Sequence, residues 1–195
     1  MESNLLTPER LVLQIIDVQQ GLAVRIDDRA RVVARIARMI RCAAVLGIPM
    51  VANTQYRKGL GPYVADLEPL LVGVPQFDKT EFNALANRET AAYFAALPRE
   101  RNTVALVGIE THICVYQTAM GLLSRGLDVW VVSDAVSSRH CEDHLAGLSR
   151  LQANGAMVGP VEMLVYELLG RAGTPVFKEI LPHILERDAE SPAGV

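Results

Sequence analysis

Cys114 is the residue of this chain best placed to act as a nucleophile. It follows a β-branched apolar run, residues 103–107, which ends at Gly108. Beyond Thr111 the apolar residues recur at helical intervals, so this stretch predicts a buried strand, a tight turn and a helix. With Thr111 as the N-cap, Cys114 lies in the first helical turn, where the helix dipole favours the nucleophilic thiolate. The alternative is a small buried hydrophobic residue, because free cysteine is among the most buried residue types.

Other polar side chains are expected at the same edge of the molecule. In a parallel sheet, ligands bind beyond the carboxyl ends of the strands, and several polar residues directly follow predicted strands. They are Asp17, Asn53, Gln55, Asp78, Lys79, residues 110–114, Ser133 and Asp134. This set combines a thiol with carboxylates and a lysine, which suits acid–base and covalent chemistry. Taken alone, Asp17 is more simply a turn cap, and Lys79 a solvated loop residue.

The composition excludes several classes of protein. Of the 195 residues, 50% are hydrophobic and 21% charged, as in a globular domain with a large core. The net charge of −3 gives no electrostatic basis for binding nucleic acid or anionic lipid. The three cysteines show no paired spacing, and no apolar run approaches the roughly 20 residues of a membrane-spanning helix. The first residues do not resemble a signal peptide. We therefore expect a cytoplasmic protein that binds neither nucleic acid nor membranes.

Five arginines cluster in one predicted helix. They are Arg29, Arg31, Arg35, Arg38 and Arg41. Their steps of mostly three and four residues predict the solvated face of an amphipathic helix rather than a phosphate-binding patch.

Apolar runs and helical periodicities alternate along the chain. Strands are expected at residues 11–16, 48–52, 74–77, 103–107, 128–132 and 156–158. Helices are expected at residues 28–46, 64–71, 88–96, 111–124, 141–154, 160–169 and 175–185, with a loop at 133–138. This alternation predicts a three-layer α/β fold, in which a six-stranded, mostly parallel sheet carries helices on both faces. A single domain is expected over residues 1–195, with its core from about residue 8 to 186 and a frayed C-terminal tail.

Three short motifs occur in order along the chain. The first is an apolar strand that ends in Asp-x-Gln, at Asp17. The second is Phe-x-Lys-x-x-x-(Asn/Ser)-x-(Leu/Phe), which contains Lys79, and the third is Val-Gly-Ile-x-Thr-x-x-Cys-Val, which contains Cys114. Together they resemble the isochorismatase-like cysteine hydrolase superfamily, which includes nicotinamidases, N-carbamoylsarcosine amidases and isochorismatases. The resemblance covers residues 11–158, and residues 137–139 and 175–179 look more like the isochorismatase domain-containing subgroup.

The resemblance implies a catalytic triad of Asp17, Lys79 and Cys114 and a sheet with strand order 3-2-1-4-5-6. It also implies a non-proline cis peptide bond between Ile109 and Glu110, which directs the backbone N–H groups of Glu110 and Cys114 towards a developing oxyanion. In this scheme Asp17, with a pKa raised by burial, accepts the thiol proton. The cationic Lys79 stabilises both the thiolate and the charged carboxylate.

The substrate pocket and the question of a metal ion follow from the same comparison. Residues that face the pocket, or equally serve in packing, are Gln19, Tyr56, Phe82, His112 and Tyr116. Metal-dependent nicotinamidases carry Asp-x-His and a later histidine after the second strand, where this chain has no histidine. His140 and His144 have a spacing that can chelate a metal, but a solvated helix start explains them more simply. We therefore expect neither a metal ion nor a cofactor.

The predicted function is a metal-independent cysteine hydrolase that cleaves a small amide, carbamoyl or related compound through a thioester. One alternative is a catalytically idle or redox-sensing oligomeric member that uses Cys114 as a reactive thiol. Another is an isochorismatase-type vinyl ether hydrolase, although isochorismatases proper tend to lack the cysteine. The expected partners are a small-molecule substrate and further copies of the chain, in a dimer or larger homo-oligomer. The apolar residues of helices 160–169 and 175–185 cover either the core or such a copy.

Overall fold

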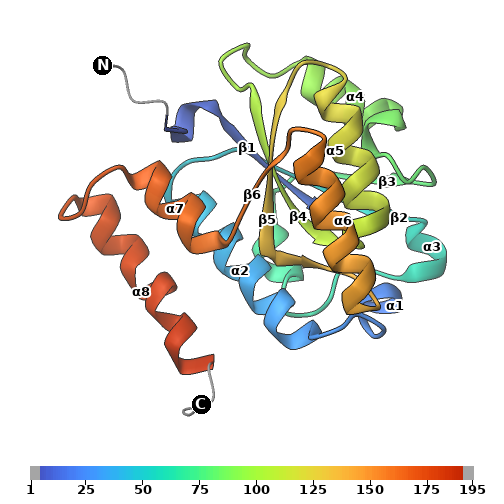
Figure 1. The fold of residues 1–195 in the computed structure, drawn as a ribbon, viewed down its shortest axis with the longest axis horizontal. Helices are drawn as coiled ribbons and strands as arrows, with labels where there is room; N and C mark the ends of the chain where they lie inside the picture. The colour runs from blue at the N-terminus through green and yellow to red at the C-terminus, as the bar shows by residue number, and fades with distance from the viewer. Residues whose placement is uncertain (1–4, 191–195) are drawn as a thin grey trace.

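A six-stranded parallel sheet runs through the centre of the molecule (Figure 1). The computed structural model describes residues 5–190, with side chains up to residue 186. The strand order is β3-β2-β1-β4-β5-β6, and every neighbouring pair is parallel. The predicted fold class and strand order are therefore confirmed. The strands are β1 (Leu11–Ile16), β2 (Met50–Gln55), β3 (Gln76–Lys79), β4 (Thr103–Ile109), β5 (Asp128–Ser137) and β6 (Met157–Gly159).

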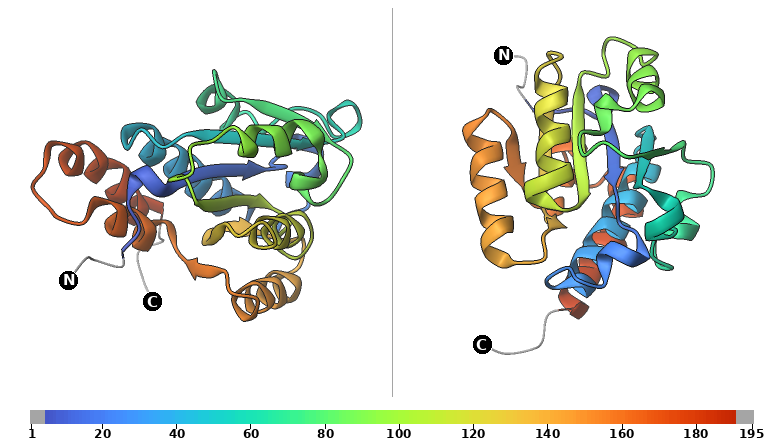
Figure 2. Two further views of the ribbon diagram at one scale, coloured as in Figure 1. Left: turned by 90° about the horizontal axis from the view of Figure 1, so that it is seen from above. Right: turned by 90° about the vertical axis from the view of Figure 1, so that its right-hand side faces the viewer.

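Helices cover both faces of the sheet (Figure 2). On one face α2, α7 and α8 enclose the larger apolar cluster, and on the other α5 and α6 enclose a second one. The expected helix at 64–71 is only a 3₁₀ turn, Glu68–Leu71. The helices are α1 (Gln20–Ala23), α2 (Arg29–Val45), α3 (Arg57–Leu60), α4 (Arg88–Ala95), α5 (Tyr116–Leu123), α6 (Cys141–Ala153), α7 (Val161–Leu169) and α8 (Pro175–Glu190).

The central strand β4 shows why both faces need cover. All of its residues are buried. Val104 and Leu106 belong to the cluster with α5 and α6, whereas Ala105 and Val107 belong to the cluster with α2, α7 and α8. Successive side chains of a strand point to opposite faces, so an uninterrupted apolar strand needs helices on each side.

Two strands run further towards the site than the sequence predicted. β2 ends at Gln55 and β3 at Lys79, because buried polar residues of β2 find partners within the protein. The Asn53 side chain accepts a hydrogen bond from Gln14 Nε2 at 2.8 Å and donates to the Thr90 hydroxyl at 2.9 Å. Asn53 therefore belongs to a buried polar network instead of the ligand-binding edge.

β5 also continues into the segment predicted as a loop, residues 133–138, and ends at Ser137. Its pairing with β4 resumes after an irregularity, with Leu106 opposite Val131 and Gly108 opposite Val136. Within that irregular stretch, Asp134 accepts a hydrogen bond from the Val161 N–H at 2.8 Å, where α7 begins. Asp134 therefore stabilises the start of α7.

Two arginines of α2 correct the prediction of a solvated face. Arg35 and Arg38 expose only 6% and 3% of their surface, and Arg35 Nε lies 3.6 Å from Asp134 Oδ2. Arg31 and Arg41 do lie at the surface, where they pair with Asp28 and Glu186. The helix is thus buried along more of its circumference than its charge pattern indicated, because α8 packs against its outer side.

The C-terminal helix α8 continues to Glu190, past the expected core boundary near residue 186. The rest of the tail that was predicted to fray lies outside the described residues. Within residues 5–190, no helix is long and apolar enough to cross a membrane.

Gly108 provides a stability test for the close approach of β1 and β4. Its φ of +124° disfavours other residues, and a Cβ there would lie 2.0 Å from the carbonyl oxygen of Ile16. Gly108→Ala should therefore lower the free energy of unfolding by about 4 kcal/mol or more, measured by urea denaturation. Gly126→Ala is the control, because Gly126 has φ +77° but nothing within 4 Å; it should cost only about 1–2 kcal/mol. Equal losses would contradict the steric argument.

Candidate active site

The carboxyl ends of β1 and β3 bring two opposite charges together. Asp17 directly follows β1, and Lys79 is the last residue of β3. Lys79 Nζ donates a hydrogen bond to Asp17 Oδ2 at 2.7 Å, and both side chains are completely buried. Asp17 adopts φ +55°, a left-handed conformation that is uncommon outside glycine and often found at functional sites. Two of the residues predicted to act together are thus in direct contact.

Gln55 also belongs to this cluster. The sequence analysis placed it at the carboxyl edge of the sheet but did not include it among the site residues. It stands opposite Lys79 in the register of β2 and β3. Lys79 Nζ donates to Gln55 Oε1 at 2.6 Å, and Gln55 Nε2 donates to the Thr80 carbonyl at 2.8 Å. The lysine ammonium is therefore held between a carboxylate and an amide oxygen. The register of β2 and β3, which sets Gln55 opposite Lys79, is the signal that identifies Gln55 as part of the site.

Cys114 lies in a π-helical turn, Thr111–Val115, between β4 and α5. The prediction of Thr111 as N-cap is wrong, because Glu110 occupies that position and its carbonyl accepts hydrogen bonds from the N–H groups of Ile113 and Val115. The Thr111 hydroxyl instead forms a 2.9 Å hydrogen bond with His144 Nδ1 of α6. Short π-helical turns occur frequently at functional sites, and this one holds the thiol at the end of β4.

The surroundings of Cys114 favour the neutral thiol. Burial raises the pKa of the Cys114 thiol, the Asp17 carboxylate raises it further, and Lys79 lowers it in part. The prediction of a thiolate favoured by the helix dipole is therefore wrong, because the cost of removing the charge from water is larger. A nucleophilic sulfur in this position needs a base that removes its proton.

Asp17 is the adjacent carboxylate. Burial raises its pKa, while the Lys79 ammonium and a hydrogen bond from the Cys114 thiol lower it, and the net direction is upward. Among the described residues, Asp17 Oδ1 accepts no hydrogen bond of regular geometry, so the interaction between the Cys114 thiol and the Asp17 carboxylate is weak. The carboxylate thus lies next to the thiol with one oxygen still available.

Glu110 links the end of β4 to the segment after β5. The peptide bond that precedes it, from Ile109, is cis. Glu110 Oε2 accepts hydrogen bonds from the backbone N–H and from Nε of Arg139, at 3.0 and 3.1 Å. No sequence motif links these two residues, because they lie on different strand–helix connections.

The five predicted pocket residues differ in their surroundings. Gln19 is fully buried, and its amide bonds to backbone groups of Gln55 and Gly61, so it braces this segment. Tyr56 and Phe82 are each 52% exposed. None of these contacts tests a role in binding substrate, which stays a prediction.

His112 and Tyr116 both contact the segment around α6. His112 Nδ1 lies 2.9 Å from Ser138 Oγ, and its Nε2 lies 3.9 Å from Asp143 Oδ2. The guanidinium of Arg150 lies 5.1 Å from the centre of the Tyr116 ring. These contacts fix the turn that carries Cys114 against its neighbouring helix.

A metal centre has no evident set of ligands in the described part of the chain, where no group of three or more His, Cys, Asp or Glu side chains is arranged to hold one. His144 was predicted to be solvated with His140, but it is partly buried and bonded to Thr111. Burial lowers the pKa of His144. It is therefore a neutral packing residue of α6.

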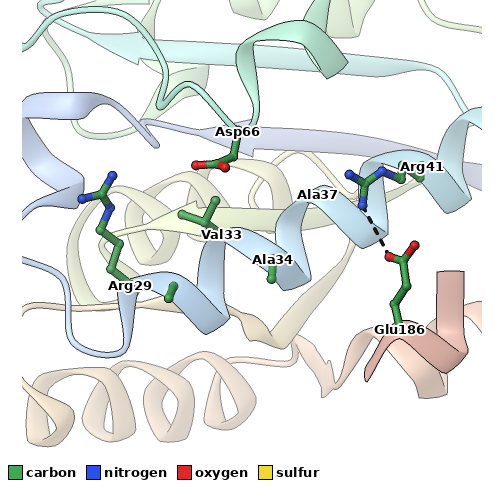
Figure 3. Close-up of a pocket in the computed structure, with 8 residues that line it drawn as sticks. Arg29, Val33, Ala34, Ala37, Arg41, Asp66 and Glu186 are labelled. Atoms are coloured by element: carbon green, nitrogen blue, oxygen red, sulfur yellow. Dashed lines mark ion pairs between the residues drawn. The ribbon is translucent and has the colours of Figure 1, made fainter. Parts of the chain in front are cut away.

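A pocket of about 590 Å³ opens beside α2, in a different part of the structure (Figure 3). Small side chains of α2 form its floor, and charged residues stand around it. The lining residues are Arg29, Ala30, Val33, Ala34, Ala37, Arg41, Asp66 and Glu186. Because it includes none of Asp17, Lys79 and Cys114, it is not the site described above.

Comparison with known proteins agrees with the motifs. The Isochorismatase domain model matches residues 11–163, which include Asp17, Lys79 and Cys114. The chain belongs to the isochorismatase family. Membership of this family indicates a hydrolase.

Similar proteins support this assignment. Isochorismatase domain-containing protein 2 of Bos taurus is 40% identical over 161 residues, which cover 83% of this chain and 76% of that protein. The structure of MAR1 ribonuclease from Caenorhabditis elegans is 34% identical, with a TM-score of 0.87 over 97% of this chain and 98% of that chain. YcaC from Escherichia coli, described as an octameric hydrolase of unknown specificity, shares the fold at 19% identity, with a TM-score of 0.84 over 98% of this chain and 100% of that chain.

Lys79→Met tests the buried ion pair through its pH dependence. Without the ammonium, Asp17 is a buried and unpaired charge, so the variant should lose about 3–5 kcal/mol of folding free energy near neutral pH. In the variant, the pKa of Asp17 in the folded state lies further above its value in the unfolded state. The loss of folding free energy therefore applies at high pH, where the carboxylate is charged. It disappears as the pH falls and the carboxylate becomes protonated. The deficit should shrink between about pH 7.5 and about pH 5, measured by urea denaturation. Lys58→Met, which removes an exposed lysine, is the control. A deficit that does not change with pH would contradict the argument.

Proposed function

We propose that this chain is a metal-independent cysteine hydrolase that cleaves a small amide, carbamoyl or related compound through a thioester intermediate. The observation that carries the proposal is the 2.7 Å contact of Lys79 Nζ with Asp17 Oδ2. This pair is completely buried beside the thiol of Cys114. A charged pair in the interior is costly, so its presence next to a thiol at the binding edge of the sheet favours a chemical role.

Asp17 acts as the base in the first step. Because the Cys114 thiol is neutral, the proton moves to Asp17 as the sulfur attacks the substrate carbonyl. The tetrahedral intermediate collapses when Asp17 returns that proton to the leaving nitrogen, which departs as ammonia or an amine. Water, activated by Asp17, then attacks the thioester and releases the acid and the free thiol. Lys79 stays protonated and stabilises each state in which Asp17 or the sulfur is negative.

The backbone N–H groups of Glu110 and Cys114 stabilise the oxyanion in this scheme. Among the described residues, the N–H of Glu110 donates no hydrogen bond that competes for it. Oriented donors of this kind are worth roughly 3 kcal/mol each in barrier height. The pair of hydrogen bonds from Arg139 to Glu110 keeps this segment in place.

The redox-sensing alternative receives less support. Sensor cysteines are accessible and have a low pKa, whereas Cys114 is 6% exposed and its pKa is raised by burial. The vinyl ether alternative does not need a thiol, so it leaves the contact between Cys114 and Asp17 without a purpose. The amide chemistry uses every member of the cluster.

Self-association is the second part of the proposal. Exposed apolar side chains gather on α7 and α8, the helices that lie with α2 on one face of the sheet (Figure 1). Met163 and Leu185 are each 55% exposed and Tyr166 is 45% exposed. The octameric neighbour shows that this fold can assemble. A cytoplasmic location, with a small molecule as the remaining partner, completes the proposal.

Removal of the nucleophile tests the hydrolase. A panel of small primary amides and carbamoyl compounds, with ammonia as the readout, should identify a substrate. Cys114→Ala and Asp17→Asn should each lower kcat for it by at least about 1,000-fold, because members of a triad act as a unit. Cys141→Ala, which removes an exposed cysteine, should leave kcat within about twofold. Retained activity in a folded Cys114→Ala protein would disprove the mechanism.

Charge on α8 tests the assembly. The wild-type protein should have the mass of a dimer or larger species by size-exclusion chromatography with light scattering. Leu185→Glu should shift it towards the monomer, because an unpaired carboxylate is costly in an apolar interface. Glu142→Gln, at an exposed position of α6 on the other face of the sheet, should leave the mass unchanged. A monomeric wild-type protein at micromolar concentration would contradict this part.

A further inference from the structure

The pocket beside α2 takes no part in the proposed chemistry, yet its volume of about 590 Å³ is that of a small-molecule site. Its floor is apolar, because Ala30, Val33, Ala34 and Ala37 line it. Val33 and Ala37 are only 7% and 5% exposed. The four positions follow one face of the helix over about 10 Å. Their small side chains leave open a space that larger residues would fill.

The two ends of this pocket differ in how their charges are paired. At one end, Arg41 Nη1 lies 3.7 Å from Glu186 Oε2. At the other end, Arg29 rises from α2 and the Asp66 carboxylate approaches the same space from the segment before the 3₁₀ turn (Figure 3). Within residues 5–186, neither the Arg29 nor the Asp66 side chain forms a hydrogen bond or an ion pair. Two opposite charges therefore face one space without contact between them.

Arg29 is an exception among the exposed arginines of α2. Arg31 and Arg41 pair with Asp28 and Glu186, whereas the Arg29 guanidinium has no such partner in the part of the chain that the structure describes. Arg29 is also the first residue of α2, where the positive end of the helix dipole adds to its charge. The Asp28 side chain caps no N–H group of this helix. This end of the pocket therefore suits a carboxylate.

Asp66 supplies the opposite charge, which suits an ammonium group. A ligand that carries a carboxylate and an ammonium close together fills the gap between Arg29 and Asp66 and satisfies both charges. An apolar group on the same ligand then covers the floor of small side chains and loses contact with water. An α-amino acid with an aliphatic side chain combines these three features. The competing explanation is that Arg29 and Asp66 are solvated residues at the rim of an empty hollow.

We propose that the pocket beside α2 binds a small zwitterion, namely an apolar α-amino acid whose carboxylate contacts Arg29 and whose ammonium contacts Asp66. The side chain of the ligand lies along the apolar floor. The proposal does not depend on the proposed hydrolase function, because the pocket includes none of Asp17, Lys79 and Cys114. Arg29 and Asp66 are both exposed, so water screens each contact and millimolar affinity is expected.

Three ligands with one side chain test the proposal on the full chain, with saturation-transfer NMR of the ligand as the readout. They are L-leucine, leucinamide, which lacks the carboxylate, and isocaproate, which lacks the ammonium. Leucine should bind saturably, and each analogue should bind roughly 5- to 30-fold more weakly, since each loses one charged contact at an exposed site. Absence of saturable leucine binding up to about 20 mM would overturn the proposal.

Two surface variants assign the contacts. Arg29→Gln should weaken leucine by roughly 5- to 30-fold and remove its advantage over leucinamide, because neither ligand then has a partner for a carboxylate. Asp66→Asn should weaken leucine similarly and remove its advantage over isocaproate. Arg99→Gln is the control, because Arg99 is an exposed arginine before β4 that does not line the pocket. Leucine binding that survives both pocket variants, or an equal loss for all three ligands, would contradict the assigned contacts.

Ala34→Phe separates this pocket from the proposed active site. The phenyl ring should occupy the space above the floor and weaken leucine at least about tenfold, while alkylation of Cys114 by iodoacetamide should stay within about twofold of its wild-type rate. Unchanged leucine binding in a folded Ala34→Phe protein would place the ligand elsewhere and overturn the proposal. If this variant does not fold, the variants of Arg29 and Asp66 decide, because they change only exposed groups.

Discussion

The burial of Asp17 against Lys79 is the constraint on which the rest of the site depends. Neither charge is stable in the interior without the other, so the ends of β1 and β3 must be held in register although β2 lies between them. β2 contributes to that register directly, because Gln55 at its end binds the same ammonium. The fully buried Gln19 ties Gln55 to the segment after β1. The sheet edge is thus a polar framework built around one ion pair.

The same burial acts on the Cys114 thiol. A dry environment that strengthens the attraction between Asp17 and Lys79 also makes an isolated thiolate unfavourable, so the pKa of Cys114 rises together with that of Asp17. The ionisations of Asp17 and Cys114 are therefore linked, and the Lys79 charge acts on both. The turn around Cys114 is π-helical and not a regular α-helical end, which weakens the helix-dipole argument for a thiolate.

Much of the fold could be predicted from the sequence, because the information is local. The apolar runs mark β1 and β4, and Asn87, directly before the helix expected at 88–96, caps α4. The errors involve partners that lie far apart in the chain. Arg35 and Arg38 have a solvent-like spacing, yet α8 and Asp134 enclose them. The end of β5 depends on an irregular pairing with β4. The hydrogen bond between Arg139 and Glu110 likewise joins residues 29 positions apart in the chain. The motifs located Asp17, Lys79 and Cys114, but only the strand register shows why Gln55 accompanies them.

The division of the interior into two apolar clusters has an evolutionary consequence. Cys114 and its turn pack with α5 and α6, whereas α7 and α8 pack with α2 on the other side of the sheet. The sheet separates the outer helices α7 and α8 from the apolar cluster that contains Cys114. The surface formed by α7 and α8 can therefore diversify while the surroundings of Cys114 on the other side stay the same. Such a division allows the arrangement of Asp17, Lys79 and Cys114 to persist in a fold whose outer surfaces change.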